Sequence, residues 1–288
     1  MSSYVIVTES GSDIHEQTAR RHGLTIVPMH VNFGDESRED DSFPSEELFE
    51  HYRATGRLPQ TAGCSPQDFI DAFDAIHGAQ PSAHIIYLAY SAATTISFKS
   101  AHLAAEGRDY ITMIDTKAVS GGLRLIVTNL ARQIELEPDM PLEQVKGFVA
   151  DQVERLRFVF IPGDLDYLRA GGRLSNIAFL GATLLRIKPV VEVVDGRLVA
   201  TKKRRGPMLK CVGQTVEELL GREELDLSRV NLTYTEGDEP DRVTRVLVET
   251  LLRRAGVQEV EWVKSGCVIA SHAGPGAFGM AVLAARAD

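Results

Sequence analysis

Four short runs of β-branched and aromatic residues within the first 165 residues constrain the fold more than any other feature of this chain. Each run ends in small polar residues, and stretches that suit helices separate the runs. One such stretch opens with Ser65, Pro66 and Asp68, a typical helix start. Strands that alternate with helices indicate βα units and a mostly parallel sheet. We therefore predict an N-terminal α/β domain with strands at 4–8, 84–90, 110–115 and 157–161.

Hydroxyl side chains gather where the first three of these runs end. In open sheets of parallel strands, ligands bind outside the carboxyl ends of the strands. A site at this edge would therefore be rich in hydroxyl groups. The hydroxyl-bearing residues at the strand ends are Thr8, Ser10, Ser12, Ser91, Thr94, Thr95 and Thr116.

The second half of the chain has a different pattern. Two β-rich runs over 189–201 are joined by Asp195-Gly196, which is typical of a tight hairpin. Further strands are expected at 230–236 and 260–263, and an amphipathic helix at 243–256 that ends in glycine. Few parallel crossovers fit this order of elements. We predict a second domain of the α+β class, and the 288 residues are enough for two domains.

The stretch 265–285 has no formally charged residue and is as long as a membrane-spanning helix. It contains His272, Pro275 and four glycines, so we expect a strand (CVIAS, 267–271), a glycine-rich loop and a short helix instead. The loop matches G-x-G-x-x-G at 274–279, but too few residues follow it for the βαβ unit of a dinucleotide site. His272, at the expected strand end, is either a structural residue or part of a site.

Composition and motifs argue against several functional classes. The formal charge of −9 argues against a general nucleic-acid binder, and the basic cluster KKRR at 202–205 is more typical of a solvated face than of a site. Three cysteines far apart in sequence favour a reducing compartment. The N-terminus lacks the features of a signal peptide. We expect a cytoplasmic protein without an integral membrane segment or a nucleic-acid partner.

Catalytic and cofactor motifs are missing from the sequence. It has no G-x-S-x-G elbow, no Walker-type loop and no cluster of histidines and cysteines with metal-ligand spacing. Hydroxyl groups and one imidazole can bind a carboxylate, because hydrogen bonds to a charged group are comparatively strong. The apolar stretches 177–185 and 278–285 either line a pocket for an apolar tail or form ordinary core helices.

A series of motifs, in order along almost the whole chain, resembles the DegV family. This family comprises bacterial fatty-acid-binding proteins that include the FakB subunits of fatty acid kinase. Each motif alone is weak, but the ordered set is specific. The motifs are YVIVTESGSDI, PQTAGCSP, SAATTISFKSA, IDTKAVSGGLR, GDLDYLRAGGRLS, LLRIKPVVEVVDGRL and SHAGPGAFG.

The resemblance implies a two-domain DegV-like α/β fold with one long-chain fatty acid buried between the domains. In this chain that means an N-terminal domain over 1–165, with a mostly parallel sheet and flanking helices, and a C-terminal α+β domain over 166–288. The resemblance also implies a lipid-binding carrier rather than an enzyme. Such a carrier needs no cofactor, and it presents the fatty-acid carboxylate to a separate FakA-like kinase that makes acyl phosphate.

The resemblance also implies which residues form the site. Arg173 matches the arginine of the family's G-G-R motif, which lies near the head group and faces the kinase or phosphate. The glycine after the histidine lets the backbone pass close to the ligand. The carboxylate would be held by loop hydroxyls and this histidine loop, that is by Thr61, by Ser91 or Thr95, and by His272 and Gly274.

Two loops depart from the family pattern. Thr61 of the family's P-x-T-S-Q-P-S-P loop is kept, but the serine and glutamine after it are replaced by Ala62 and Gly63. The glycine of the family's S-G-T has become Ile96. A second hypothesis is therefore an enzyme acting on a small carboxylated or phosphorylated substrate in the same cleft. A regulatory protein that senses lipid would share the pocket with the carrier.

Overall fold

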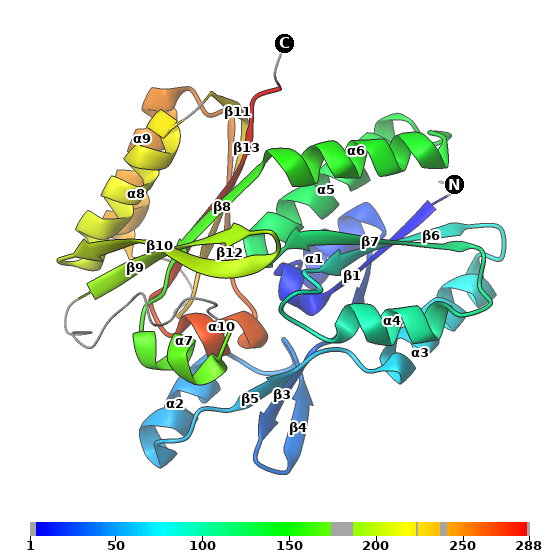
Figure 1. Cartoon of the computed structure of the whole chain (residues 1–288), viewed down its shortest axis with the longest axis horizontal. Helices are drawn as coiled ribbons and strands as arrows, with labels where there is room; N and C mark the ends of the chain where they lie inside the picture. Colours follow the sequence, from blue (N-terminus) through cyan, green and yellow to red (C-terminus); the bar gives the residue numbers. More distant parts are fainter. Residues whose placement is uncertain (1–3, 174–186, 223, 237–240, 287–288) are drawn as a thin grey trace.

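Two large sheets with flanking helices make up most of the molecule (Figure 1). This computed structural model describes residues 4–173, 187–222, 224–236 and 241–286. All the strands of the first sheet are parallel, in the order β2-β1-β6-β7, which confirms the parallel arrangement predicted for the N-terminal half. They are β1 (Tyr4–Glu9), β2 (Thr25–Val27), β6 (His84–Tyr90) and β7 (Ile111–Ala118).

Helices cover both faces of the first sheet, because the apolar side chains of its strands point alternately to either side. On one face, Ile85 and Tyr87 pack with Phe69 of α3. On the other face, Ile86 packs with Ile126 of α5. The helices that flank this sheet are α1 (Glu16–His22), α3 (Pro66–Ala79), α4 (Ser97–Ala105), α5 (Ser120–Leu136) and α6 (Leu142–Arg155).

The predicted start of α3 is confirmed in detail. Ser65 is the N-cap, and its hydroxyl accepts a hydrogen bond from the backbone N–H of Asp68. The Asp68 carboxylate accepts one from the backbone N–H of Ser65, which completes a capping box. Pro66 occupies the first helical position, where a missing N–H has no cost.

The second sheet has six strands in the order β10-β9-β8-β13-β11-β12, antiparallel except for the pair β11 and β12. Asp195 and Gly196 form the predicted hairpin turn, with φ angles of 47° and 76°. The strands are β8 (Leu156–Ile161), β9 (Ile187–Val194), β10 (Arg197–Arg205), β11 (Leu225–Tyr234), β12 (Glu259–Lys264) and β13 (Phe278–Ala284). The predicted α+β character of the second half is therefore confirmed.

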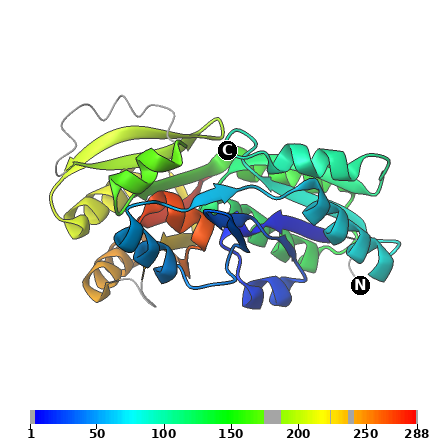
Figure 2. The same ribbon diagram turned by 90° about the horizontal axis from the view of Figure 1, so that it is seen from below.

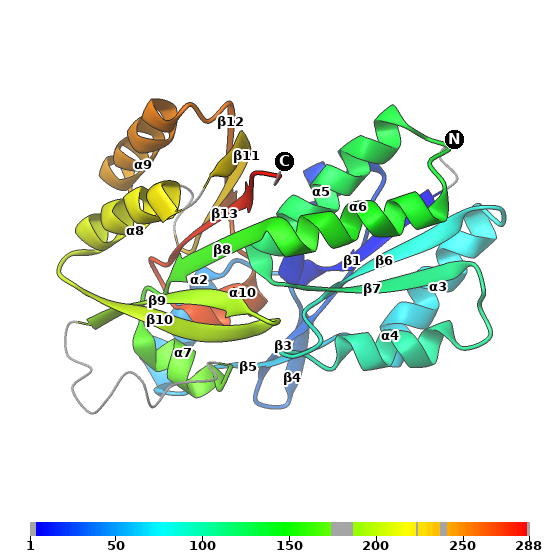
Figure 3. The same cartoon turned by 45° about the horizontal axis from the view of Figure 1, so that its top comes forward.

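Helix α5 lies between the two large sheets. One side of it packs on the first sheet through Leu123 and Ile126, whereas Leu125 packs on Phe158 and Ala281 of the second. The other face of the second sheet is covered by α8 (Met208–Arg222) and α9 (Arg242–Ala255). Figure 3 shows α5 and α6 along the first sheet, and α8 and α9 on the outer side of the second sheet. The sheets thus share a helix, which fixes the space between them.

A third, small sheet in the order β4-β3-β5 closes one end of this space. Seen from below in Figure 2, it lies with α2 beside α10 at the junction of the two large sheets. Side chains of α2, α7 and α10 pack in one apolar cluster that includes Phe49, Tyr167 and Val268. The elements are β3 (His30–Phe33), β4 (Glu36–Glu39), β5 (Gln60–Ala62), α2 (Glu46–Thr55), α7 (Leu165–Gly171), α10 (Cys267–Ala273) and the short helix η1 (Ser10–Ser12).

Two elements near the C-terminus were predicted in the wrong order. The run CVIAS at 267–271 is helical and belongs to α10, and 278–284 form the strand β13 instead of a helix. Every residue of β13 is buried in the middle of the sheet, so it lacks the alternation that identifies a half-exposed strand. Short apolar runs do not distinguish strand from helix by periodicity alone.

One strand was assigned to the wrong sheet. The run 157–161 was expected with the N-terminal strands, but β8 pairs antiparallel with β9 and β13 of the second sheet. The change from one sheet to the other thus precedes β8, before the division predicted between 165 and 166. The acidic segment 35–47 contains β4 and a buried carboxyl at Asp40. No helix in the described parts of the chain is long and apolar enough to cross a membrane.

Candidate functional site

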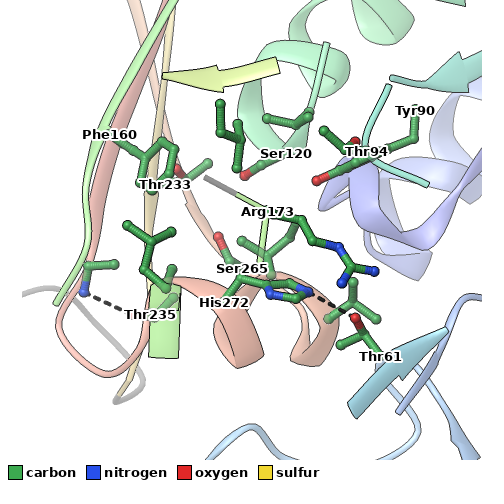
Figure 4. Close-up of a pocket in the computed structure, with 18 of the residues that line it drawn as sticks. Thr61, Tyr90, Thr94, Ser120, Phe160, Arg173, Thr233, Thr235, Ser265 and His272 are labelled. Carbon is green, nitrogen blue, oxygen red and sulfur yellow. Dashed lines mark hydrogen bonds between the residues drawn. The ribbon is translucent and has the colours of Figure 1, made fainter. Parts of the chain in front are cut away.

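A cavity lies between the two large sheets, and the small sheet and α10 close one side of it (Figure 4). The space enclosed by its walls and its opening is about 800 Å³, a figure that includes solvent at the opening. Apolar side chains form most of its wall, notably Val119, Phe158, Phe160, Leu168, Leu198, Val268, Ile269 and Phe278. Among the described lining residues there is no carboxylate, and Arg173 is the only cation.

The hydroxyl of Thr61 and the imidazole of His272 meet at one end of this cavity. Thr61 lies on β5 and His272 in the last turn of α10, and Thr61 Oγ1 is 2.8 Å from His272 Nε2. The other ring nitrogen, Nδ1, is buried and has no hydrogen-bond partner. Nε2 is therefore the ring nitrogen available to the site.

His272 is neutral at physiological pH. Burial, and to a lesser extent the nearby charge of Arg173, lowers the pKa of its imidazole to about 4. A neutral imidazole carries one N–H. When this N–H is on Nε2, it can donate a hydrogen bond to the hydroxyl oxygen of Thr61. In that tautomer the O–H of Thr61 is free to donate to a ligand. The pair can thus bind an anion through a hydrogen bond without itself carrying a charge.

Arg173 lies at the boundary between the cavity and an open groove outside it. The groove is lined by residues of α2, β5 and α7, and it shares Thr61, Arg173 and His272 with the cavity. Arg173 is exposed, and its Nη1 donates to the backbone oxygen of Gly171 at 2.8 Å. The guanidinium is thus held beside the polar end of the cavity, where it remains open to solvent.

Gly171 allows His272 to occupy its place. A Cβ atom on Gly171 would lie 2.1 Å from Nδ1 of His272, well inside van der Waals contact. The backbone of α7 therefore packs directly on the ring. This contact explains the unpartnered Nδ1 and requires glycine at this position.

Thr95 lies at the same end of the cavity as Thr61. Its Oγ1 is 3.0 Å from the hydroxyl of Ser97, which accepts the backbone N–H of Cys64 at 3.1 Å. A Cβ on Gly63 would come within 2.5 Å of the Thr95 hydroxyl and 2.6 Å of the Ser97 hydroxyl. The two loops that depart from the family pattern therefore fit each other, with glycine in one making room for hydroxyls of the other.

Two of the expected site residues do not line the cavity. Ser91 is fully buried, and its hydroxyl donates to the carbonyl of Gly196 in the β9–β10 turn at 2.7 Å. Gly274 follows α10 with a φ of 71°, and a Cβ there would lie 3.0 Å from Asp164. Its carbonyl accepts a hydrogen bond from Thr235. Both residues connect neighbouring segments, and the structure brings together Thr61, Thr95, His272 and Arg173.

The other hydroxyls at the strand ends have structural partners or lie away from the cavity. Thr8 donates to the carbonyl of Leu88, and Thr116 donates to that of Ala89. Ser10 donates to a carboxylate oxygen of Asp40. Thr94 lines the cavity and donates to the carbonyl of Ser91. An inventory of hydroxyls at strand ends therefore overestimates the number available to a ligand.

Several polar residues of the wall were not anticipated from the sequence. Tyr90 lines the cavity, and its hydroxyl has no hydrogen-bond partner among the described residues. The hydroxyls of Ser120 and Ser265 lie 2.5 and 3.1 Å from one carboxylate oxygen of Asp13. Burial raises the pKa of Asp13 to about 6. Thr233 of β11 and Thr235, just after this strand, complete the set. Only the fold brings these segments together, so no local motif points to them.

Other candidate sites lie elsewhere or are already occupied by protein groups. Of the basic cluster, Lys202 and Arg204 on β10 both pair with Glu218 of α8. The apolar stretch 177–185 lies outside the described residues. Ligand atoms of Asp40, Asp41 and Cys267 lie within 4.8 Å of one another, but the Asp40 carboxylate already accepts hydrogen bonds from protein groups. Neither cluster favours a second site.

Comparisons of sequence and of structure with known proteins agree on one family. A family model described as an uncharacterised protein of the DegV family matches residues 3–285. A DegV domain-containing protein from Deinococcus radiodurans is 31% identical, over 97% of this chain and 98% of its own. A fatty-acid-binding DegV protein from Thermus thermophilus superimposes with a TM-score of 0.86 at 27% identity, covering 99% of this chain and all of that one. A stearic-acid-binding protein from Eubacterium ventriosum superimposes with a TM-score of 0.83 at 25% identity, over 98% of both chains.

Proposed function

This chain belongs to the DegV family, and from that premise we propose that it binds a long-chain fatty acid between its two large sheets. The tail is buried in the cavity, and the carboxylate lies at the end formed by Thr61, Thr95 and His272. The protein acts as a carrier that presents this carboxylate to a separate kinase for acyl-phosphate formation. The observation that carries the proposal is a single cavity with apolar walls and one polar, cationic end.

The walls suit a long apolar tail. Side chains of both large sheets and of α10 contribute to them, including Phe158, Leu198 and Ile269. Burying a methylene group contributes about 0.8 kcal/mol, so a dozen of them offer on the order of 10 kcal/mol before the costs of association. The solved relatives from Thermus thermophilus and Eubacterium ventriosum, described as binding fatty acid and stearic acid, support the same class of ligand.

The polar end suits a carboxylate. Thr61 can donate its O–H while accepting from Nε2 of His272, and Tyr90 and Thr95 add hydroxyl groups nearby. Arg173 supplies the only positive charge among the described lining residues, and no carboxylate opposes it. Hydrogen bonds to a charged group contribute about 1.5–3 kcal/mol each. These groups favour an anionic head group over a neutral one.

The groove outside this end supports presentation of the head group to a partner. It is open to solvent and shares Thr61, Arg173 and His272 with the cavity. A carboxylate at the shared boundary is therefore reachable while its tail stays buried. Phosphoryl transfer requires the attacking oxygen to be accessible to the nucleotide of the kinase. Arg173, exposed at this boundary, would stabilise the phosphate that forms.

Native mass spectrometry with lipid extraction of the purified protein tests the binding step. We expect an added mass that matches a saturated or unsaturated long-chain fatty acid. Titration with a fluorescent fatty acid then compares Arg173→Gln with Arg205→Gln, two exposed arginines of which only the first lines the cavity. The first change should weaken binding about tenfold, and the second should leave it unchanged. A protein that neither carries nor acquires fatty acid would refute the proposal and favour an enzyme acting on a small carboxylated or phosphorylated substrate.

The presentation step needs its own experiment. The loaded protein is mixed with the catalytic subunit of a bacterial fatty acid kinase and ATP, and acyl phosphate is measured. Product should form only when both proteins are present, and Arg173→Gln should lower its yield even at saturating fatty acid. Binding without product formation would leave a lipid-binding protein of the regulatory class.

A further inference from the structure

Thr233 projects a hydroxyl group into the cavity away from the polar end just described. It lies on β11, and Figure 4 shows it beside Phe160 on the wall formed by the second sheet. Its hydroxyl has no hydrogen-bond partner among the described residues. The other serine and threonine hydroxyls of the wall all have one: Thr61, Thr94, Thr95, Ser120, Thr235 and Ser265.

The Thr233 side chain fits between two glycines, which have no Cβ atom to collide with it. A Cβ atom on Gly279 of β13 would lie 2.4 Å from the Thr233 hydroxyl oxygen. A Cβ on Gly121 of α5 would lie 2.6 Å from the methyl group of the same side chain. The same hypothetical Cβ on Gly279 would contact the Phe158 ring and Cβ of Phe160 at 3.3 and 3.4 Å. The hydroxyl is therefore held in one place within an otherwise apolar part of the wall.

A second polar side chain lies on this face of β11. Side chains two apart on a strand point to the same side, so Asn231 shares the face of Thr233. Asn231 is fully buried, and neither atom of its amide has a hydrogen-bond partner. The opposite face of the strand is apolar, with Val230 and Leu232 packed in the core under α8 and α9. An ordinary strand beneath a hydrocarbon tail would have an apolar side chain at position 233, which lines the cavity.

We propose that the cavity accommodates a fatty acid that carries a hydroxyl or keto oxygen along its chain, with Thr233 as the residue that recognises this oxygen. The proposal rests on the fatty-acid-binding function proposed above. An unsubstituted chain that passes Thr233 leaves the hydroxyl without a partner, and a buried unpaired polar group costs free energy. A chain oxygen at this level can accept the O–H of Thr233, and a chain hydroxyl can also donate to it.

The test compares stearic acid with a series of monohydroxystearic acids whose hydroxyl is placed at successive carbons along the middle of the chain. Each competes with a fluorescent fatty acid for the purified, delipidated protein. At the best position, the hydroxylated acid should bind about 2- to 10-fold more tightly than its neighbours in the series, as one added hydrogen bond predicts.

Two variants connect that preference to Thr233. In Thr233→Val, which keeps the shape of the side chain, the preference among positions should disappear, and stearic acid should bind at least as tightly as in the wild type. In Thr233→Ser, which keeps the hydroxyl, the preference should remain. A series without a preferred position, or a preference that survives in Thr233→Val, would overturn the proposal.

The outcomes separate this inference from the function on which it rests. Failure of stearic acid and of all its hydroxylated forms to bind would refute fatty-acid binding itself. Tight binding of stearic acid with an identical rank order in wild type and Thr233→Val would refute only the role of Thr233. A thermal unfolding curve of each variant shows whether it is folded before the binding data are interpreted.

Discussion

The hydroxyl of Thr61 lies 2.8 Å from Nε2 of His272, although 211 residues separate the two in the sequence. This hydrogen bond joins the small sheet to α10 and places a neutral imidazole and a hydroxyl together at the polar end of the cavity. Because Nδ1 of His272 has no partner, the hydrogen bond with Thr61 is the only one that the described residues make to that ring. The pair is thus both a structural connection and the centre of the proposed head-group site.

Replacing Thr61 with valine should destabilise the ligand-free protein and weaken fatty-acid binding. The change keeps the side-chain shape but leaves both nitrogens of His272 without a partner, which costs about 1–3 kcal/mol. Urea unfolding of delipidated protein measures this loss. Thr250→Val is the matched control, because Thr250 is half-buried on α9 and its hydroxyl donates only within its own helix. Equal stability of the two variants would contradict the role of the pair.

Fatty-acid affinity should be almost independent of pH between about 6 and 8. The pKa of His272 is lowered to about 4, so the imidazole is neutral throughout this range. If an imidazolium charge held the carboxylate, affinity would fall about tenfold for each pH unit above its pKa. Isothermal titration at several pH values distinguishes these cases. A steep decline in affinity above pH 6.5 would show that the histidine binds the ligand in its charged form.

Gly171→Ala should displace His272 and weaken binding although residue 171 does not line the cavity. The added Cβ would lie 2.1 Å from Nδ1, so the ring must move away from Thr61. We expect a stability loss of about 1–3 kcal/mol and an affinity loss of about tenfold. Gly147→Ala on α6 is the control, since no atom lies within 4 Å of its Cβ and it should stabilise the helix by about 0.5–1 kcal/mol. Unchanged affinity in Gly171→Ala would argue against a head-group role for His272.

Ser91 and Thr95 should respond differently to loss of the hydroxyl. Ser91→Ala removes the hydrogen bond to Gly196 and should cost about 1 kcal/mol of stability while leaving affinity unchanged. Thr95→Val removes a hydroxyl from the cavity wall and should weaken fatty-acid binding. Unfolding and binding measurements on both variants decide which of the two alternatives offered by the sequence contacts the carboxylate. An affinity loss confined to Ser91→Ala would reverse the assignment.

Asp13→Asn should change how stability depends on pH. Burial raises the pKa of Asp13 to about 6, above its value of about 4 in an unfolded chain. The folded state therefore binds more protons between these values, and the wild type loses stability as pH rises through this window. The variant lacks the titrating carboxyl. Its free energy of unfolding, relative to that of the wild type, should therefore increase from pH 4 to pH 7 by on the order of 3 kcal/mol. Parallel stability curves for the two proteins would show that Asp13 does not titrate there.

Local patterns in the sequence were sufficient for the elements whose formation depends on near neighbours. The capping box of α3 and the hairpin at Asp195-Gly196 follow from residues a few positions apart, and both are present. The parallel first sheet follows from apolar runs that alternate with helices. The ordered motifs identify the family, and they include Thr61, Arg173 and His272, which the structure brings to one end of the cavity.

The tertiary structure decided what depends on contacts between distant segments. Residues 267–271 and 278–284 are similar short apolar runs, but one packs as a helix on α2 and α7 while the other fills a central position in the second sheet. Because the two large sheets share α5, a cavity lined by Thr233 and Tyr90 lies between them. No spacing of residues in the sequence indicates how far apart the two sheets lie. Hydrogen-bond partners determine which hydroxyls remain available, as Ser91 and Thr95 show. Local chemistry thus determined the elements and the family, and packing over long sequence separations determined the site.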